Sequence, residues 1–255
     1  MWQGHSVSVV LPTYRERGSI RQVICDFFAT GVVDEVIVVN NNAEPGTSEE
    51  VDGTGAREVM EPMQGYGHAI RRGLREAQTN YVVVCEPDAT FVAKDIFKLL
   101  AYADNFDVVY GSRTSQQLVW KGATMGRFLR WGNWAVAKYL EFLFDATNLT
   151  DVGCTMRLIR REAAAALEPN FRIGGNEFGP EMMILSLRQG HRVIQIPVNY
   201  LPRVGTSSVT GDPVKAFVLG LRMIVLITRS RFGRPDSPTF RRATNEAPEL
   251  VGRRD

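Results

Sequence analysis

Strand-like and helix-like apolar patterns alternate through the first half of this chain. Short apolar or β-branched runs stand at residues 6–11, 35–39, 56–60, 81–85 and 107–110. Apolar residues at helical spacing fill segments between these runs, at residues 17–30, 66–78 and 94–104. Parallel strands need crossover connections of this kind, so the alternation predicts an α/β fold with a mostly parallel central sheet flanked by helices.

The second half of the chain adds longer helices. We expect helices at 124–144, near 181–189 and at 212–229, with strands at 153–159 and 192–198. From residue 232 the chain is polar and rich in Pro and Arg without periodicity, which is typical of disorder. With 255 residues and 44% hydrophobic content, we expect a single domain over 1–231 and a disordered tail over 232–255.

The composition argues against several classes of protein. Thirty basic and 28 acidic residues leave a net charge of +2, so we expect no nucleic-acid partner. The three cysteines, Cys25, Cys85 and Cys154, are far apart and lack metal-ligand spacing, which predicts reduced core residues in a cytoplasmic protein. Neither a secretory leader nor a run of about 18 uncharged apolar residues is visible, so we expect no membrane-spanning helix.

Two carboxylates follow the predicted strand at residues 81–85. Glu86 and Asp88 stand on either side of Pro87. Ligands of open α/β sheets bind outside the carboxyl ends of the strands, where these side chains are expected. The pair suits a hard divalent cation, Mg²⁺ or Mn²⁺, that also binds substrate phosphates, although an isolated Glu-x-Asp is more often a solvated turn.

Two further polar loops follow predicted strands and open on the same edge of the sheet. They occupy residues 12–16 and 40–43. Each loop alone is ordinary turn chemistry. Together with residues 86–88, the ordered set predicts a nucleotide site whose phosphates share the cation. Spaced glycine-rich phosphate loops are absent from the sequence, which argues against an NTPase or a dehydrogenase.

Six short segments occur in an informative order. They read P-T-Y-R-E at 12–16, Q-G-Y-G-H-A at 64–69, E-P-D at 86–88, G-S-R at 111–113, D-V-G-C-T-M-R at 151–157, and I-P-V through R-V-G-T-S at 196–207. This set resembles the motifs of the family 2 glycosyltransferases, which have the GT-A fold. Within that family the chain is most similar to the polyprenyl-phosphate sugar transferases, such as dolichol-phosphate mannosyltransferase. The resemblance covers residues 6–230.

The resemblance implies an inverting hexosyltransferase of cell-envelope glycan biosynthesis. It would move one hexose from a nucleotide-diphosphate sugar, of the GDP-mannose or UDP-glucose type, to a dolichyl or undecaprenyl phosphate. The donor-nucleotide contacts that it implies are Pro12, Tyr14, Glu16, Asn40, Gln64, Glu86, Pro87 and Asp88. Glu86 and Asp88 are the implied metal ligands. The implied catalytic residues are Asp88 and Arg113, and Glu181 joins them as a catalytic candidate if the acceptor is a hydroxyl.

The acceptor decides whether the reaction needs a protein base. A phosphate monoester is already largely anionic near neutral pH, because its second pKa is about 6. A hydroxyl of a soluble or glycan acceptor needs a carboxylate, for which Glu181 is the first candidate and Glu177 the second. Both acceptors stay open at this point. For a lipid phosphate the expected contacts are Arg113, Arg127, Arg130 and Arg203.

Two departures from the family motifs bear on the donor. Asn40, Asn41 and Asn42 stand where an Asp-Asp-Gly-Ser run is usual, which removes negative charge near the base and leaves the nucleotide unidentified. Glu86 replaces the usual first Asp, a change of one methylene that an oxygen-liganded cation site can absorb. The asparagines also keep open a function of another class, an inactive nucleotide-sugar-binding protein.

Two helical segments combine apolar and basic residues. Residues 120–144 mix Arg127, Arg130 and Lys138 with Trp and Phe, and residues 212–230 are apolar between Lys and Arg residues. Such helices suit a membrane interface beside anionic lipids, although an amphipathic core helix is the plainer interpretation. We expect peripheral attachment at the cytoplasmic face of a membrane. The sequence leaves the oligomeric state open.

Overall fold

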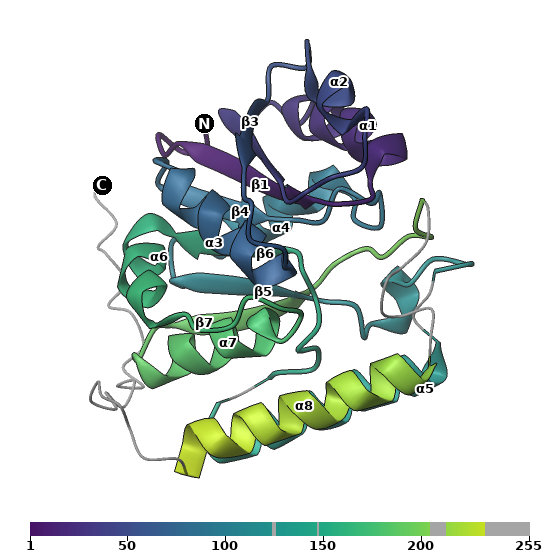
Figure 1. Cartoon of the computed structure of the whole chain (residues 1–255). Helices are drawn as coiled ribbons and strands as arrows, with labels where there is room; N and C mark the ends of the chain where they lie inside the picture. Colours follow the sequence, from purple (N-terminus) through teal and green to yellow (C-terminus); the bar gives the residue numbers. More distant parts are fainter. Residues whose placement is uncertain (124–125, 147, 205–212, 233–255) are drawn as a thin grey trace, which may run out of the picture.

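One mixed seven-stranded sheet forms the centre of the protein (Figure 1). The computed structural model describes residues 1–123, 126–146, 148–204 and 213–232. The strand order is β3-β2-β1-β4-β6-β5-β7. The strands are β1 Val7–Thr13, β2 Glu35–Asn40, β3 Arg57–Met60, β4 Tyr81–Val84, β5 Val108–Ser112, β6 Arg157–Arg160 and β7 Val193–Pro197. Only β6 runs antiparallel to its neighbours within these described strands, so the expected mostly parallel sheet is confirmed.

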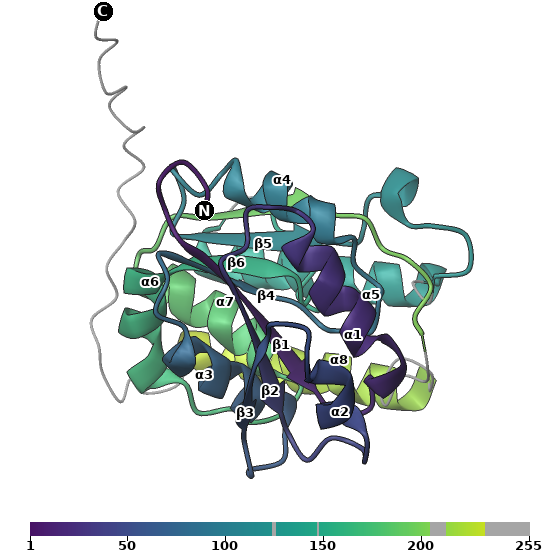
Figure 2. The same cartoon turned by 90° about the horizontal axis from the view of Figure 1, so that it is seen from above.

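Helices cover both faces of this sheet (Figure 2). The α-helices are α1 Arg17–Phe28, α2 Thr47–Val51, α3 Tyr66–Glu76, α4 Ile96–Leu100, α5 Arg127–Phe144, α6 Arg161–Leu167, α7 Phe178–Arg188 and α8 Pro213–Phe232. One hydrophobic cluster holds side chains of α1 and α4, and the second holds side chains of α3, α6 and α7. Helices α5 and α8 extend the second cluster and pack along each other (Figure 1).

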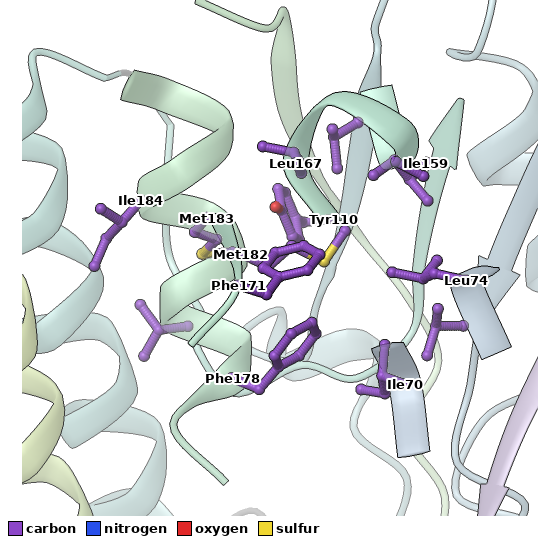
Figure 3. Packing of buried hydrophobic residues seen from close by; sticks show 14 of the residues in the cluster. Ile70, Leu74, Tyr110, Ile159, Leu167, Phe171, Phe178, Met182, Met183 and Ile184 are labelled. Carbon is purple, nitrogen blue, oxygen red and sulfur yellow. The ribbon is translucent and has the colours of Figure 1, made fainter. Parts of the chain in front are cut away.

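Burial on both faces explains the apolar runs of the strands. Val9 and Val10 are consecutive on β1 and fully buried, one in each hydrophobic cluster. A strand that is covered on both faces needs apolar residues at every position. A Cβ atom at Gly73 would lie 2.2 Å from Val10 Cγ1, so this glycine lets α3 lie against β1. Figure 3 shows the second cluster between the sheet and α7, where the rings of Phe171 and Phe178 have centroids 4.8 Å apart.

Strand β1 continues past Pro12 to Thr13, although the apolar run that predicted it ends at residue 11. The strand continues beside β2 to Thr13, whose carbonyl accepts a hydrogen bond from the N–H of Asn41 at 3.0 Å. Backbone groups of successive strand residues point to opposite sides, so those of Pro12 face the β4 side. There β4 has already ended at Val84, which pairs with Val10. The missing N–H of proline therefore interrupts no ladder bond.

The expected lengths of several elements were wrong. Helices α2 and α6 were not expected. Helix α2 has only five residues, and α6 is a run of alanines without apolar periodicity. The helix expected at 94–104 is the shorter α4, preceded by a 3₁₀ turn at Ala93–Asp95. The strand expected at 153–159 begins only at Arg157, since residues 153–156 form a loop.

Three expectations about the chain as a whole have mixed outcomes. Cys25 is exposed on α1, so its assignment to the core was wrong, whereas Cys85 and Cys154 are buried. None of the described helices has both the length and the apolar character needed to cross a bilayer. The tail expected from residue 232 lies, beyond Phe232, outside the described residues, as do residues 205–212, which include the end of the last motif.

Candidate active site

A cavity of about 530 Å³ lies at the carboxyl ends of the parallel strands, between the sheet and helices α5 and α8. Parallel pairing of β1 with β2 and with β4 brings their three following loops to this edge, as the sequence predicted. The predicted site residues that line the cavity are Pro12, Tyr14, Glu16, Gln64, Glu86, Arg113 and Arg203. The opposite wall is apolar and comes from α5 and α8, with Leu129, Val136, Phe217, Leu221, Met223 and Ile224.

Glu16 shapes the loop that follows β1. Its Oε2 atom accepts hydrogen bonds from the backbone N–H groups of Tyr14 at 2.7 Å and Arg15 at 2.8 Å. One carboxylate oxygen is therefore committed to the backbone of the loop, which presents Pro12 and Tyr14 to the cavity. This role is conformational, and it leaves the second oxygen of Glu16 for a ligand.

The asparagine run holds two loops together. Asn40 donates from Nδ2 to Glu58 Oε1 at 2.8 Å, accepts the N–H of Ala43 at 2.8 Å, and does not line the cavity. Asn41 lines it instead and accepts the backbone N–H of Gly65 at 2.8 Å. The asparagine that lines the cavity is thus one position later than the one that the sequence analysis named. Asn41 is the first residue after β2, where the chain turns toward the site.

Glu86 and Arg203 line one end of the cavity, and Asp88 lies buried behind them without lining it. Asp88 is fully buried, and its Oδ1 accepts hydrogen bonds from the N–H of Thr90 at 2.9 Å and its hydroxyl at 2.5 Å. Asp88 Oδ2 accepts no hydrogen bond within the described chain, although Arg203 Nη2 lies 2.5 Å away. The same nitrogen lies 3.0 Å from Glu86 Oε2. One guanidinium therefore stands between the two carboxylates.

The carboxylate oxygens at this end suit a divalent cation. Burial, and next the negative charge of Asp88, raise the pKa of Glu86 to about 7, against the opposing pull of Arg203 and Arg113. Asp88 Oδ2, which has an ion pair but no hydrogen bond, and the Glu86 carboxylate form an oxygen donor set that fits Mg²⁺ or Mn²⁺. No group of three or more acidic, His or Cys side chains able to hold a metal occurs among the described residues. A cation here would take its remaining ligands from water and a phosphate-bearing substrate.

Arg113 lines the cavity as half of a buried ion pair. Its Nε and Nη2 atoms lie 2.9 and 3.0 Å from the two carboxylate oxygens of Asp151. Burial opposes the charge of Arg113, but Asp151 keeps the pKa of the guanidinium well above its ordinary value. The pair fixes a permanent positive charge at the cavity wall, with one edge of the fork engaged.

Other predicted residues lie outside the cavity. Glu181 accepts the backbone N–H groups of Arg172 at 2.8 Å and Ile173 at 3.0 Å, so its carboxylate orders that loop and does not face the site. Pro87 accepts the Ser19 hydroxyl at 2.6 Å through its carbonyl. Arg130 does not line the cavity, and the side chain of Arg127 lies outside the described part of α5.

The comparisons with known proteins agree with this geometry. The sequence pattern described as glycosyl transferase family 2 matches residues 8–167. The chain belongs to glycosyl transferase family 2.

Two curated relatives are similar to this family 2 glycosyltransferase over most of its length. A dolichyl-phosphate hexose transferase of Haloferax volcanii is 30% identical over 209 residues, which cover 81% of this chain and 87% of that protein. Glycosyltransferase AglJ of the same organism is 26% identical over 232 residues, covering 90% of this chain and 74% of that protein.

Solved structures support the GT-A fold of the family 2 glycosyltransferase. Glucosyl-3-phosphoglycerate synthase from Mycobacterium tuberculosis, in complex with phosphoglyceric acid, matches with a TM-score of 0.70 at 20% identity. The match covers 92% of this chain and 82% of that one. A second structure of that enzyme, with Mn²⁺, uridine diphosphate and glucosyl-3-phosphoglycerate, matches with a TM-score of 0.69.

One cavity residue of this glycosyltransferase was missed by the sequence analysis. Arg157 lines the cavity although it is only 1% exposed, and no site role was assigned to it. It begins β6, and because β6 is antiparallel, its first residue lies at the edge where parallel strands end. The signal was available in the motif at 151–157, which ends on this arginine. A basic residue in a short strand otherwise looks like an exposed position.

Proposed function

We propose that this enzyme transfers one hexose from a nucleotide-diphosphate sugar, of the GDP-mannose or UDP-glucose type, to a polyprenyl phosphate, with inversion at the anomeric carbon. The observation that carries the proposal is a cavity that joins a carboxylate-bearing polar end to an apolar wall. The dolichyl-phosphate hexose transferase among the relatives supports the same acceptor class. The phosphate head of such an acceptor matches the polar end, and its isoprenoid tail matches the apolar wall.

The polar end is the proposed donor site. Pro12, Tyr14 and Gln64 would contact the nucleotide, and Glu86 with Asp88 would hold Mg²⁺ or Mn²⁺. When bound, such a cation neutralises the diphosphate leaving group. The metal-bearing complexes of the solved glycosyltransferase support this cofactor class. Arg113 adds a fixed positive charge, which Asp151 keeps in place.

The positions of the carboxylates around the cavity favour a phosphate nucleophile. Among the described lining residues, the carboxylates are Glu16 and Glu86, both at the donor end. Glu16 keeps one oxygen free, but it lies with Glu86 at the proposed donor end, and Glu181 is bonded to the backbone of residues 172–173. A hydroxyl acceptor therefore finds no carboxylate placed as a base among the described residues. A phosphate monoester needs none and can displace the leaving group directly.

Helices α5 and α8 are the proposed membrane-facing surface. Trp131 is 67% exposed and Phe142 81% exposed on α5, and Phe217 is 57% exposed on α8. Exposed Arg222 and Arg229 lie on α8 beside this apolar surface. Aromatic and aliphatic side chains flanked by basic ones suit the interface of a bilayer with anionic lipids. The same two helices form the apolar cavity wall, so an acceptor would enter from the membrane.

The test is direct transfer. Purified enzyme is incubated with Mn²⁺, labelled GDP-mannose or UDP-glucose, and vesicles that carry undecaprenyl or dolichyl phosphate, with Asp88→Asn as a matched inactive control. We expect label in the lipid phase from one of the two donors. Transfer to phosphoglyceric acid and not to the lipid would replace the proposal with a soluble acceptor, of the kind bound to the solved glycosyltransferase. Donor binding without any transfer would favour an inactive binding protein.

A further inference from the structure

Arg157 is a buried cation without an acidic partner in the described chain. Its Nε donates to the carbonyl of Thr155 at 3.3 Å, and its Nη2 donates to the carbonyl of Cys154 at 2.7 Å. Its Nη1 has only the weak acceptor Met182 Sδ at 3.6 Å. No ion pair joins Arg157 to a carboxylate of the described residues, in contrast to Arg113. A guanidinium has five N–H donors, so two of them lack a partner here.

This arrangement is costly for a side chain that is 1% exposed. A buried charge is ordinarily paired, because two carbonyls and a sulfur replace little of the hydration that is lost. The face of Tyr110, whose ring centroid lies 5.6 Å from the guanidinium carbon, adds only a modest attraction. Figure 3 shows Tyr110 and Met182 together in the layer between the sheet and α7. The remaining deficit points to an anion that arrives from the cavity.

Two more polar groups on the same wall have no partner. The hydroxyls of Tyr66 and Thr155 are buried and make no hydrogen bond within the described chain. Both residues line the cavity together with Arg157. Burial raises the pKa of the Tyr66 phenol, with Arg157 opposing, so the phenol stays a neutral hydrogen-bond donor. Buried hydroxyls are normally satisfied, and two that are not, beside an unpaired guanidinium, form a preorganised set of donors.

Two glycines let the backbone approach the cavity arginines closely. A Cβ atom at Gly179 would lie 3.3 Å from Arg157 Nη2 and 3.2 Å from the carbonyl oxygen of Val152. A Cβ atom at Gly153 would lie 2.9 Å from Arg113 Nη2 and 3.0 Å from Asn133 Oδ1 of α5. The loop at 151–154 thus separates two arginines and carries the wall from the sheet toward α5.

We propose that Arg157, Tyr66 and Thr155 form an inner anion site that takes the phosphate group of the acceptor. The identification of the anion as the acceptor's rests on the proposed function. The proposed donor end has its own charged groups, Glu86, Asp88 and Arg203. The loop beside Arg157 instead adjoins Asn133 of α5, where the apolar wall begins. A phosphate at Arg157 would leave its isoprenoid chain along α5 and α8.

The experiment measures binding without metal, donor or turnover. Isothermal titration compares citronellyl phosphate, a soluble isoprenoid phosphate, with inorganic phosphate and with uridine diphosphate. The variants are Arg157→Gln and Arg160→Gln. Arg160 is a matched control, because it lies on the same strand and also donates to carbonyls, those of Ala103 and Asp104, away from the cavity. We expect citronellyl phosphate to bind the wild type and Arg160→Gln alike, and at least about tenfold more weakly to Arg157→Gln.

Conservative variants keep the test valid if Arg157→Gln does not fold. Tyr66→Phe and Thr155→Val each remove one unpartnered hydroxyl, and each should weaken citronellyl phosphate severalfold without lowering the melting temperature. Unchanged binding in both, or in folded Arg157→Gln, would overturn the site. A loss confined to uridine diphosphate would overturn the acceptor assignment. Arg157-dependent binding with no glycolipid product would refute the proposed function while the anion site stands. Normal transfer to the lipid by Arg157→Gln would refute the acceptor site while the proposed function stands.

Discussion

Arg203 occupies the place where the proposed cation would bind, with one nitrogen 2.5 Å from Asp88 Oδ2 and 3.0 Å from Glu86 Oε2. A cation that enters must displace this guanidinium. Arg203→Gln should therefore tighten Mn²⁺ binding in the absence of nucleotide by about tenfold, or about 1.4 kcal/mol. Titration followed by electron paramagnetic resonance of Mn²⁺ measures it. Arg192→Gln, which removes an exposed ion pair with Asp107, is the control. Equal affinity in Arg203→Gln and wild type would contradict this role.

Asp88 carries the strongest prediction about activity. Asp88→Asn keeps an oxygen for the hydrogen bonds from Thr90 but removes the charge of the buried carboxylate. We expect turnover to fall at least about a hundredfold, a few kcal/mol of transition-state stabilisation. The melting temperature of the metal-free protein should change little, because repulsion with Glu86 is relieved as the ion pair with Arg203 is lost. Asp26→Asn on α1 serves as the control, and full activity of Asp88→Asn would refute the metal-site assignment.

Glu86 should give the folded protein a measurable pH dependence. Its pKa is about 7 in the folded state, against an ordinary value of 4.5, chiefly because of burial and then of Asp88. At pH values between these two pKa values, the folded state binds more protons than the unfolded state. The contribution of Glu86 to the unfolding free energy therefore falls as the pH rises. We expect urea unfolding in EDTA to show that the unfolding free energy of Glu86→Gln rises relative to that of the wild type as the pH increases from 5 to 8. Parallel curves would contradict the raised pKa.

At the scale of the element, the contact of α3 with β1 depends on a missing side chain. Gly73→Ala would place a Cβ atom 2.2 Å from Val10 Cγ1, within the buried strand. We expect a loss of about 1–3 kcal/mol in unfolding free energy from overpacking. Gly18→Ala in α1, where no atom lies within 4 Å of the added Cβ, should be neutral or gain up to about 1 kcal/mol. Chemical denaturation measures the unfolding free energy of both variants. Equal stability of Gly73→Ala and Gly18→Ala would contradict the packing argument.

The outer surface of α5 offers a test of membrane attachment. Phe142 is 81% exposed and does not line the cavity, so Phe142→Asp should leave the fold and the binding of nucleotide intact. Partition onto vesicles with anionic lipid should fall about tenfold or more, since burying a phenyl ring is worth roughly 1.5–3 kcal/mol. Met60→Asp on the edge strand β3 removes a side chain that is 58% exposed, and it should have no effect on partition. Equal partition of both variants would exclude α5 as the contact surface.

For the whole molecule, the sequence predicted what depends on local pattern. Continuous apolar runs marked the strands because both faces of the sheet are covered, and three polar loops marked the edge that carries the cavity. The antiparallel course of β6 is set by pairing with β4 and β5, which no local pattern specifies. For the same reason Arg157 was not named as a site residue. The sequence also contains no sign that Glu181, the candidate base for a hydroxyl acceptor, accepts the N–H groups of residues 172–173.

The position of β6 in the sheet also has a consequence for the order in which the protein can fold during synthesis. Strands β1 to β4 are synthesised first and form one contiguous part of the sheet, so they can pair before the rest of the chain is made. Strand β5 emerges next, but its described partners are β6 and β7, which follow about 45 and 80 residues later. Until Arg160 has left the exit tunnel, a nascent chain would hold an open β4 edge and an unpaired apolar strand. The second half of the cavity is therefore assembled last, around the strand that carries Arg157.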